Sequence, residues 1–329
     1  MRPLRRQDVV GRPRWWNGRI YLDNVRLMRV GKAELTPVLE LEAGLVPVAG
    51  LCHGWDPAQV EAHAEWLYPR HVDPVTGMAR LSHHSWLLRT GDFTLLVDPC
   101  IGNSKSRALP PNEYYDMLDT PWLDRLAAAG THPDEIDLVV CTHLHPDHCG
   151  WNTRLVDGRW NPTFPNARYV LSAPEVSFWD AFARAPDRFP EFAYNRGVFE
   201  DSVAPVLEAG LVELLDDGDS PAPGVTLLAT PGHTAGHWSA CYADDLDGVC
   251  FSGDVLHSPV HVLRPEWTLS PSPGANFDHQ AAAASRRAVL DHCATTGHLL
   301  APAHFQTPHA CRIAHSTDGR YLLSWPTEI

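Results

Sequence analysis

The sequence predicts an α/β protein in which strands and helices form stacked layers. Strand-like and helix-like segments alternate along most of the 329 residues, and no internal repeat or low-complexity stretch interrupts them. Hydrophobic residues make up 44% and charged residues 20%, the balance of an ordinary globular protein with a sizeable core. No uncharged apolar run reaches about 18 residues, so we expect neither a membrane-spanning helix nor a membrane partner.

The N-terminal half predicts strands, a hairpin and two helices. Short strand-like pieces run from residue 20 to about 51, and Asp56–Tyr68 has the capping aspartate and first-turn proline of a short helix. His84–Asn103 has the pattern of two apolar strands around a Gly-Asp turn, the second ending on Asp98. Thr120–Gly130 combines a cap, an early proline, apolar spacing and a terminal glycine, which is typical of a helix.

The C-terminal half predicts further strands that end in polar turns. Three successive strands end on Thr230, near Asp244 and at Asp254, whereas residues 186–219 give no clear pattern. The other expected elements are a buried strand before residue 141, a strand at Asn166–Ala173, helices near Pro174–Arg184 and at Asp278–Thr295, a strand at His298–Phe305 and a hairpin at Arg312–Trp325.

Charge and cysteine content bear on partners and location. The formal net charge of −14 argues against a nucleic-acid partner, because phosphate contacts need clustered Lys and Arg. The basic first residues lack the apolar segment of a secretory signal, so we expect a cytoplasmic protein. The eight cysteines form no C-x-x-C pair, and we interpret them as reduced, mostly buried thiols; they are Cys52, Cys100, Cys141, Cys149, Cys241, Cys250, Cys293 and Cys311.

The stretch "VVCTHLHPDHCG" (Val139–Gly150) indicates a metal site. His143 and His145 are two positions apart, so they point to the same side of an extended strand end. The following proline stops the strand and lets Asp147 and His148 turn back toward the same point. Neutral imidazoles and carboxylates suit zinc or iron. The alternative is a polar helix cap whose histidines are satisfied by hydrogen bonds.

One loop cannot complete two metal shells, so further ligands must come from other strand ends. His233 in "TPGHTAGH", Asp254 in "FSGDVLH" and His304 in "PAHF" each follow an apolar strand directly. Any one of them alone is as well explained as a turn residue. Together they favour metal binding.

With these residues the sequence resembles the metallo-β-lactamase-fold hydrolase superfamily, from about His83 to His304. The family pattern is an aspartate after an early strand, H-x-H-x-D-H, a histidine after a Pro-Gly turn, a bridging aspartate and a final histidine. It falls here on Asp98, His143, His145, Asp147, His148, His233, Asp254 and His304. The resemblance implies a four-layer αβ/βα sandwich with metals at one edge between the sheets.

The resemblance also implies the ligand sets. One metal would be held by His143, His145 and His233, the second by Asp147, His148 and His304, with Asp254 bridging both. Asp98 would orient a ligand histidine. We expect two Zn²⁺, with iron or manganese as alternatives. Cations sharing a water lower its pKa to about 7 and give a hydroxide nucleophile. Asp147 is a candidate catalytic residue that orients this water and accepts or passes on a proton.

The lactonase and parathion hydrolase branch fits the sequence best. Asp254 disfavours a true β-lactamase, and a C-terminus with only two arginines disfavours a glyoxalase II-like thioesterase. We therefore expect an enzyme similar to an N-acyl homoserine lactonase, which hydrolyses a small lactone or carboxylic ester. Because lactonases of this type are often dimers, the resemblance also implies a homodimer. The alternatives are a phosphotriester or phosphodiester hydrolase and a non-catalytic metal-binding protein.

His257 stands where several lactonases of the family have a tyrosine. It is a candidate catalytic residue that donates to oxyanion charge or protonates a leaving alkoxide, or else it lines the wall. We expect His237 to be structural and Cys149 to be a buried thiol. His83, His84, His261 and His279 either line the cleft or are satisfied elsewhere. Aromatic residues at 12–19, 178–192 and 265–271 suit an apolar pocket or the core.

For domain organisation we expect one structural unit. Residues 1–80 would form an N-terminal extension that packs on the core, and residues 81–329 the catalytic domain of the metallo-β-lactamase fold.

Overall fold

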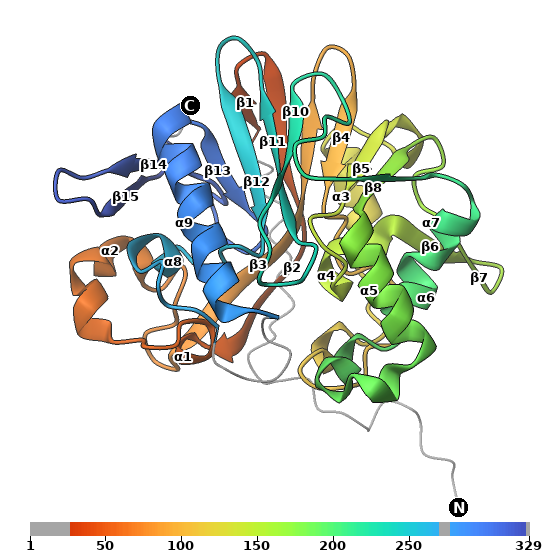
Figure 1. Ribbon diagram of the computed structural model, residues 1–329, viewed down its shortest axis with the longest axis horizontal. Coiled ribbons are helices and arrows are strands. Elements are labelled where there is room, and N and C mark those ends of the chain that lie inside the picture. The colour runs from red at the N-terminus through yellow and green to blue at the C-terminus, as the bar shows by residue number, and fades with distance from the viewer. Residues whose placement is uncertain (1–26, 270–276, 327–329) are drawn as a thin grey trace, which may run out of the picture.

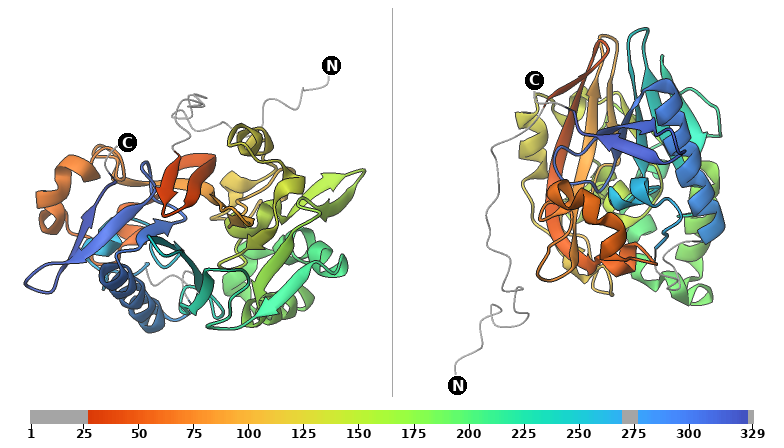
Figure 2. Two further views of the ribbon diagram at one scale, coloured as in Figure 1. Left: turned by 90° about the horizontal axis from the view of Figure 1, so that it is seen from above. Right: turned by 90° about the vertical axis from the view of Figure 1, so that its left-hand side faces the viewer.

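The chain folds into two β-sheets packed face to face, with helices on both outer sides (Figure 1). The computed structural model describes residues 27–269 and 277–326. Figure 2 shows the two sheets from two further sides, with the long helix α9 (His279–Thr296) on the outer face of one of them. The predicted α/β class and the four-layer sandwich are confirmed.

The first sheet has seven strands in the order β1-β2-β3-β4-β5-β8-β9. Strands β1 to β4 pair antiparallel, and β4, β5, β8 and β9 pair parallel. The strands are β1 Met28–Val30, β2 Ala33–Pro47, β3 Met78–Arg89, β4 Thr94–Val97, β5 Leu138–Val140, β8 Arg168–Ser172 and β9 Val212–Leu215.

The second sheet has six strands in the order β10-β11-β12-β13-β14-β15, of which β12 and β13 are parallel neighbours. These strands are β10 Val225–Ala229, β11 Trp238–Ala243, β12 Gly248–Gly253, β13 Leu299–Pro302, β14 Cys311–His315 and β15 Tyr321–Ser324. A separate hairpin joins β6 (Thr153–Val156) and β7 (Arg159–Pro162).

The helices cover the outer faces and the sheet ends. The α-helices are α1 Val48–Leu51, α2 Ala64–Leu67, α3 Trp122–Ala128, α4 Pro146–Cys149, α5 Ala173–Arg184, α6 Val198–Ser202, α7 Ala204–Glu208, α8 Val260–Leu263 and α9. The 3-10 helices are η1 Pro57–His63, η2 Glu113–Tyr115, η3 Pro133–Glu135, η4 Gly150–Asn152, η5 Pro186–Arg188 and η6 Pro190–Asn195.

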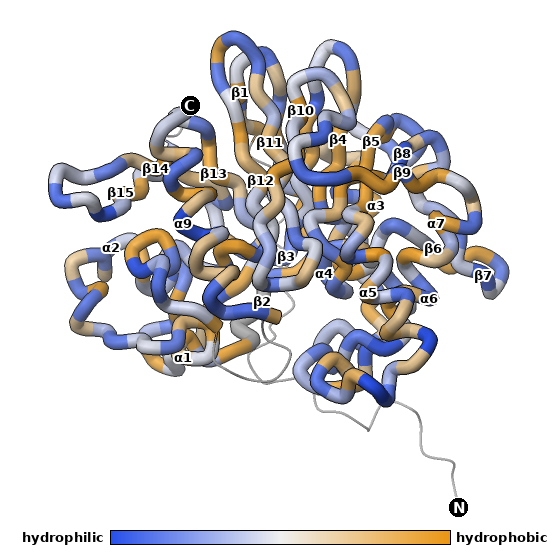
Figure 3. Tube along the Cα trace, viewed as in Figure 1, coloured by the Kyte–Doolittle hydropathy of each residue, from blue (hydrophilic) through white to orange (hydrophobic). Residues whose placement is uncertain are grey.

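The core lies in three layers between these elements. Apolar residues such as Trp86, Val140 and Phe251 fill the space between the two sheets. Trp122 and Trp179 pack α3 and α5 against the first sheet, and a third cluster packs α9 against the second. Burying one large apolar side chain contributes about 1.5 to 3 kcal/mol, so the layers hold the strand ends rigidly. Figure 3 shows the hydrophobic strands and the more hydrophilic loops at their ends.

Most predicted elements are present, with bounds that differ by a few residues. The largest difference is β2, one strand of 15 residues where the sequence suggested short pieces. Its pairing with β3 shifts register twice, between Leu39 and Leu41 and between Gly44 and Val46. Each shift breaks the inward-outward alternation on which sequence reading depends. The helix predicted at Asp56–Tyr68 consists of η1 followed by α2.

Strands β1 and β2 of the N-terminal segment belong to the first sheet, whereas α1, η1 and α2 pack in a separate apolar cluster with Val260 and Trp267. Strand β2 pairs with β3 over almost its whole length, from Glu34 opposite Arg89 to Pro47 opposite Met78. Residue 80, where we placed the end of the N-terminal extension, lies within β3, and that domain boundary stays a prediction. Among the described residues, no helix combines the length and apolarity needed to cross a membrane.

Candidate metal centre

The residues predicted to bind metal lie on loops at one end of the two sheets. Strands β4 and β5 run parallel in the first sheet, as do β12 and β13 in the second, so the loops that follow each pair leave from the same edge. The structure brings all seven predicted ligands together there, in overlapping groups whose ligand atoms lie within 4.8 Å of one another; they are His143, His145, Asp147, His148, His233, Asp254 and His304.

The loop after β5 is shaped by a proline and a glycine. Pro146 is the first residue of the short helix α4, which turns the chain after His145. Gly150 follows α4 and donates its backbone N–H to the carbonyl of Cys100 at 2.7 Å. A Cβ atom at this position would lie 1.7 Å from the carbonyl oxygen of Ile101. Only glycine therefore allows this loop to close against the loop after β4.

Three imidazoles form the first half of the centre. The Nε2 atoms of His143 and His233 each lie 3.0 Å from Nδ1 of His145. Ligands bound at about 2.0 to 2.1 Å in a tetrahedron lie about 3.3 Å apart, so these separations fit a single cation. Burial lowers the pKa of His143 and His233 well below the usual value and that of His145 to about 4. The rings are thus neutral, the form that binds metal.

The second half of the centre contains carboxylates. Oδ1 of Asp254 lies 3.3 Å from Nε2 of His148 and 3.0 Å from Nε2 of His304, and Oδ2 of Asp147 lies 3.7 and 3.6 Å from the same two nitrogens. Burial by itself would lower the pKa of both histidines, but these carboxylates raise it. Positive charge is therefore favoured here. Nδ1 of His304 contacts the carbonyl oxygen of Ser82, which can only accept.

Asp98 fixes which nitrogens face the centre. It accepts hydrogen bonds from the backbone N–H and the hydroxyl of Thr142, and its Oδ2 lies 2.9 Å from Nδ1 of His148. Because the Thr142 hydroxyl donates to Asp98, it accepts from Nδ1–H of His143. Nε2 of His143, His148 and His304 is then free to offer a lone pair inward. The donor set fits two divalent cations.

Asp254 lies between the two halves. Its Oδ2 is 3.3 Å from Nε2 of His233 and 3.8 Å from Nε2 of His143, while its Oδ1 faces the second half. The backbone N–H of Asp254 donates to Nε2 of His237, whose Nδ1 lies 2.9 Å from the hydroxyl of Thr230. His237 thus holds the loop of Asp254 beside the turn that carries His233, which agrees with a structural role.

His257 faces Asp254. Its Nε2 lies 3.1 Å from Oδ2 of Asp254, and its ring stacks on the ring of His304 at a centroid distance of 5.5 Å. Its backbone N–H donates to Nδ1 of His261. His257 therefore lies beside the carboxylate shared by the two halves and beside the ring of His304, and its catalytic role stays a proposal.

The other residues named from the sequence lie in different surroundings. His83 lies near Asp147, whereas His84 contacts the hydroxyl of Ser82, and His261 contacts the carbonyl of Leu51. His279 is the half-buried first residue of α9. Cys149 is buried, and its thiol donates to the carbonyl of His145. Burial raises the pKa of this thiol, which keeps it protonated, as expected of a buried thiol. Of the three aromatic segments, residues 12–19 lie outside the described residues, as do 270 and 271 of the third.

Two residues of the centre escaped sequence reasoning. The hydroxyl of Tyr115 donates to Oδ2 of Asp147 at 3.1 Å. The buried carboxylate of Glu175 accepts from the backbone N–H groups of Leu144 and Gly236, and so ties together the two loops that carry the first three imidazoles. Glu175 looked like an ordinary first-turn helix acid, and no sequence signal marked Tyr115.

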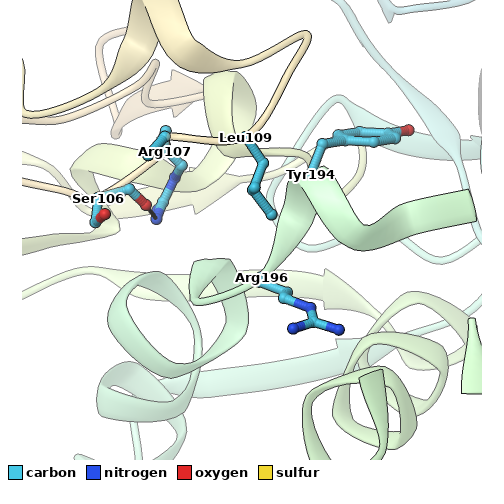
Figure 4. A pocket seen from close by; sticks show the side chains of 6 residues that line it. Ser106, Arg107, Leu109, Tyr194 and Arg196 are labelled. Atoms are coloured by element: carbon cyan, nitrogen blue, oxygen red, sulfur yellow. Dashed lines mark hydrogen bonds between the residues drawn. The ribbon is translucent and has the colours of Figure 1, made fainter. Parts of the chain in front are cut away.

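A small cavity lies beside the centre. It is lined by Ser106, Arg107, Ala108, Leu109, Tyr194 and Arg196 (Figure 4). The Tyr194 ring belongs to this lining and lies 6.3 Å from the ring of His145, one of the predicted ligands. The Arg107 guanidinium is paired with Asp201 at 2.8 Å and is not available as a free charge.

The fold and the centre define an α/β sandwich protein with a candidate dinuclear metal site at its sheet edge. Residues 78–293 match the model of the metallo-beta-lactamase superfamily, and the chain belongs to that superfamily.

Named relatives and solved structures agree with this family. The chain is 31% identical over 131 residues to N-acyl homoserine lactonase AttM of Agrobacterium fabrum, a match that covers 38% of this chain and only 44% of that protein. It is 26% identical over 215 residues to N-acyl homoserine lactonase AiiA of Bacillus thuringiensis subsp. kurstaki, covering 61% and 72% of the two chains.

Two solved structures are similar in fold over almost their whole length. The hydrolase AbOPH superposes with a TM-score of 0.72 at 23% identity, covering 92% of this chain and 97% of that one. The dizinc quorum-quenching lactonase AidC superposes with a TM-score of 0.68 at 18% identity, covering 92% and 98%.

Proposed function

We propose that this protein is a hydrolase that uses two divalent cations, zinc first among them, to cleave a lactone or carboxylic ester of modest size. The observation that carries the proposal is Asp254, whose two carboxylate oxygens face different sets of imidazoles. A carboxylate in this position can bridge two cations a few ångströms apart. The names of the relatives, N-acyl homoserine lactonases, support an acyl lactone as the substrate class.

The residues around the cations have separate tasks in this proposal. When bound, the cations supply Lewis acidity that acidifies water and polarises the substrate carbonyl. The Asp147 side chain is 12% exposed, whereas the other ligand-type residues are buried. Asp147 is thus the carboxylate that water can reach, and we assign it to orient the attacking water and to take its proton.

His257 is the proposed donor to the leaving group. Its Nε2 lies 3.1 Å from Oδ2 of Asp254, the carboxylate that would bridge the cations. A proton on this nitrogen can pass to the leaving alkoxide oxygen, or can stabilise charge on the carbonyl oxygen. In His257→Gln we expect kcat to fall by about 100-fold with both cations retained. Loss of a cation without a separate effect on kcat would instead make His257 a support for Asp254.

The substrate class is tested with a panel. The purified protein is assayed for bound metal and for hydrolysis of an N-acyl homoserine lactone, an aryl ester, a phosphotriester and a glutathione thioester. We expect the lactone or the ester to react fastest, with activity lost on chelation and restored by zinc. Preferential cleavage of the phosphotriester would favour the organophosphate alternative. Two bound cations with no turnover of any substrate would favour a non-catalytic metal-binding protein.

We further propose a cytoplasmic location, supported by eight buried cysteines that are all free. The substrate would be a small molecule, since the acidic chain does not suit nucleic acid. The homodimer stays a prediction, to be checked by light scattering.

A further inference from the structure

Tyr115 and His83 lie against the second half of the metal centre without belonging to the predicted ligand set. Tyr115 ends the short 3-10 helix η2 and is buried, with 3% of its surface exposed. Its hydroxyl lies 3.1 Å from Oδ2 of Asp147 and 2.7 Å from Nε2 of His83. The His83 ring packs edge-on against Tyr115 and also against His304. The three side chains thus form a chain that ends on a predicted ligand.

The direction of this chain follows from which groups can donate. An ionised carboxylate only accepts hydrogen bonds, so the single hydrogen of the Tyr115 hydroxyl is donated to Asp147. The Tyr115 oxygen can then only accept, and the hydrogen it accepts comes from Nε2 of His83. The sequence of bonds is His83 Nε2–H to Tyr115 O–H to Asp147 Oδ2. The ionised carboxylate thus sets the direction of both bonds.

The other ligands of this half already have such outer partners. Asp98 contacts His148 through Nδ1, and the carbonyl of Ser82 contacts Nδ1 of His304. Among the described residues, Tyr115 supplies the corresponding outer partner of Asp147. Outer partners fix the orientation of a ligand and commonly change metal affinity by about 10- to 100-fold.

We propose that Tyr115 and His83 are positioning residues that hold the Asp147 carboxylate against the second cation position. The inference rests on the proposed dinuclear centre and deepens it, because it makes the affinity of one cation depend on a loop outside the ligand motif. The alternative is that His83 is itself a ligand, since its Nε2 lies 3.7 Å from Oδ2 of Asp147 in a group with His304. Its shorter contact, however, is with the Tyr115 oxygen.

The first test is Tyr115→Phe, which removes one oxygen atom and keeps the ring. Zinc affinity is measured by competition with a chromophoric chelator, and zinc content by elemental analysis. We expect one of the two zinc ions to bind about 10- to 100-fold more weakly, while the other is unchanged. Tyr169→Phe is the matched control, because that buried phenol bonds to Phe164 and Asn152 away from the centre.

The second test separates a positioning His83 from a ligand His83. His83→Leu removes the donor to Tyr115, whereas His83→Gln keeps an N–H group that can reach the same oxygen. We expect weaker binding of one zinc in the leucine variant and recovery in the glutamine variant. Equal loss in both, together with normal zinc binding in Tyr115→Phe, would overturn the proposal and make His83 a ligand.

Failure of the positioning role can be distinguished from failure of the proposed dinuclear centre. If the wild-type protein binds two zinc ions and Tyr115→Phe binds them with the same affinity, the positioning role is overturned and the dinuclear centre remains. A wild-type protein that binds no zinc would instead remove the dinuclear centre itself. If Tyr115→Phe does not fold, the His83→Leu and His83→Gln pair decides the matter by the same zinc measurement.

Discussion

The described part of the chain buries two groups of histidines with different partners. At the metal centre, Asp147 and Asp254 lie among the rings at 3.0 to 3.8 Å from their nitrogens. In the second group, His84 lies 4.5 Å from His309 between ring centroids, and His71 stacks on a tryptophan at 5.3 Å. Among the described residues, His71 and His84 contact aromatic rings, His84 also contacts the hydroxyl of Ser82, and Nδ1 of His309 contacts the carbonyl oxygen of Phe305.

The difference appears in the charge that each group favours. Burial lowers the pKa of His71 to about 3 and that of His84 well below its usual value, so these two imidazoles are neutral. At the centre, carboxylates raise the pKa of His148 and His304 in spite of burial, so positive charge is favoured there. Buried histidines therefore form a cation site only where carboxylates accompany them. The predictions below test that rule.

Removing the shared carboxylate has the largest expected effect. In Asp254→Ala both halves of the centre lose a ligand, and we expect kcat/KM for the lactone or ester to fall by about 1,000-fold or more, because the cations supply several kcal/mol. Elemental analysis should show loss of zinc. Asp56→Ala is the control, since that aspartate caps the 3-10 helix η1 by accepting from the backbone N–H of Ala58. Two zinc ions retained in Asp254→Ala would contradict the bridging position.

Weakening the support of a ligand should have an intermediate effect. Asp98 holds the loop after β5 and contacts Nδ1 of His148, so Asp98→Asn should weaken zinc binding by about 10- to 100-fold. The measurement is chelator competition on the folded variant. Asp137→Asn is a matched control. Like Asp98, Asp137 accepts from a backbone N–H, but its donor is Thr94, at the end of β4 opposite to Asp98. Equal losses in the two variants would point to general destabilisation.

Much of the centre follows from the sequence, because its ligands lie directly behind strands. The H-x-H-x-D-H spacing placed four residues, and His233, Asp254 and His304 each follow an apolar segment. The residues that the sequence does not reveal take part through contacts between segments that are distant along the chain. Tyr115 meets Asp147 across 32 positions from a single turn of 3-10 helix, and Glu175 joins two loops although its own helix would form without that contact.

In the fold, the feature that could not be predicted from the sequence is the register of β2 against β3. Glu40 lies where the pairing with β3 shifts, and its buried carboxylate accepts from the backbone of Ile101 and from the indole of Trp151. Burial raises the pKa of this carboxyl. A glutamate inside a strand looks like a solvent-facing residue in the sequence, so neither the strand length nor this contact could be predicted.

The second histidine group should affect stability through pH and leave metal binding unchanged. His71 has a pKa of about 3 in the folded protein and about 6.5 when unfolded. Between these values the unfolded chain binds more protons, so stability falls as the pH falls below about 6.5. From pH 6.5 to 5 the loss is about 2 kcal/mol. In His71→Leu, denaturant unfolding should show that the free energy of unfolding no longer has this part of its dependence on pH. The zinc content should be the same as in the wild type. An unchanged slope would mean that His71 becomes protonated in the folded state.

The smallest effect is expected for His84→Gln, because no carboxylate among the described residues contacts His84. His84 follows His83 directly in β3, but its Nδ1 contacts the Ser82 hydroxyl and its ring packs on Trp86 at 4.9 Å. Glutamine is neutral, as the buried imidazole is, and can bond to the same hydroxyl. Zinc content and affinity should therefore stay within about twofold of the wild type. His83→Leu, one position earlier, is expected to weaken one zinc site. If His84→Gln also released zinc, proximity to the centre rather than contact with its carboxylates would decide which histidines matter.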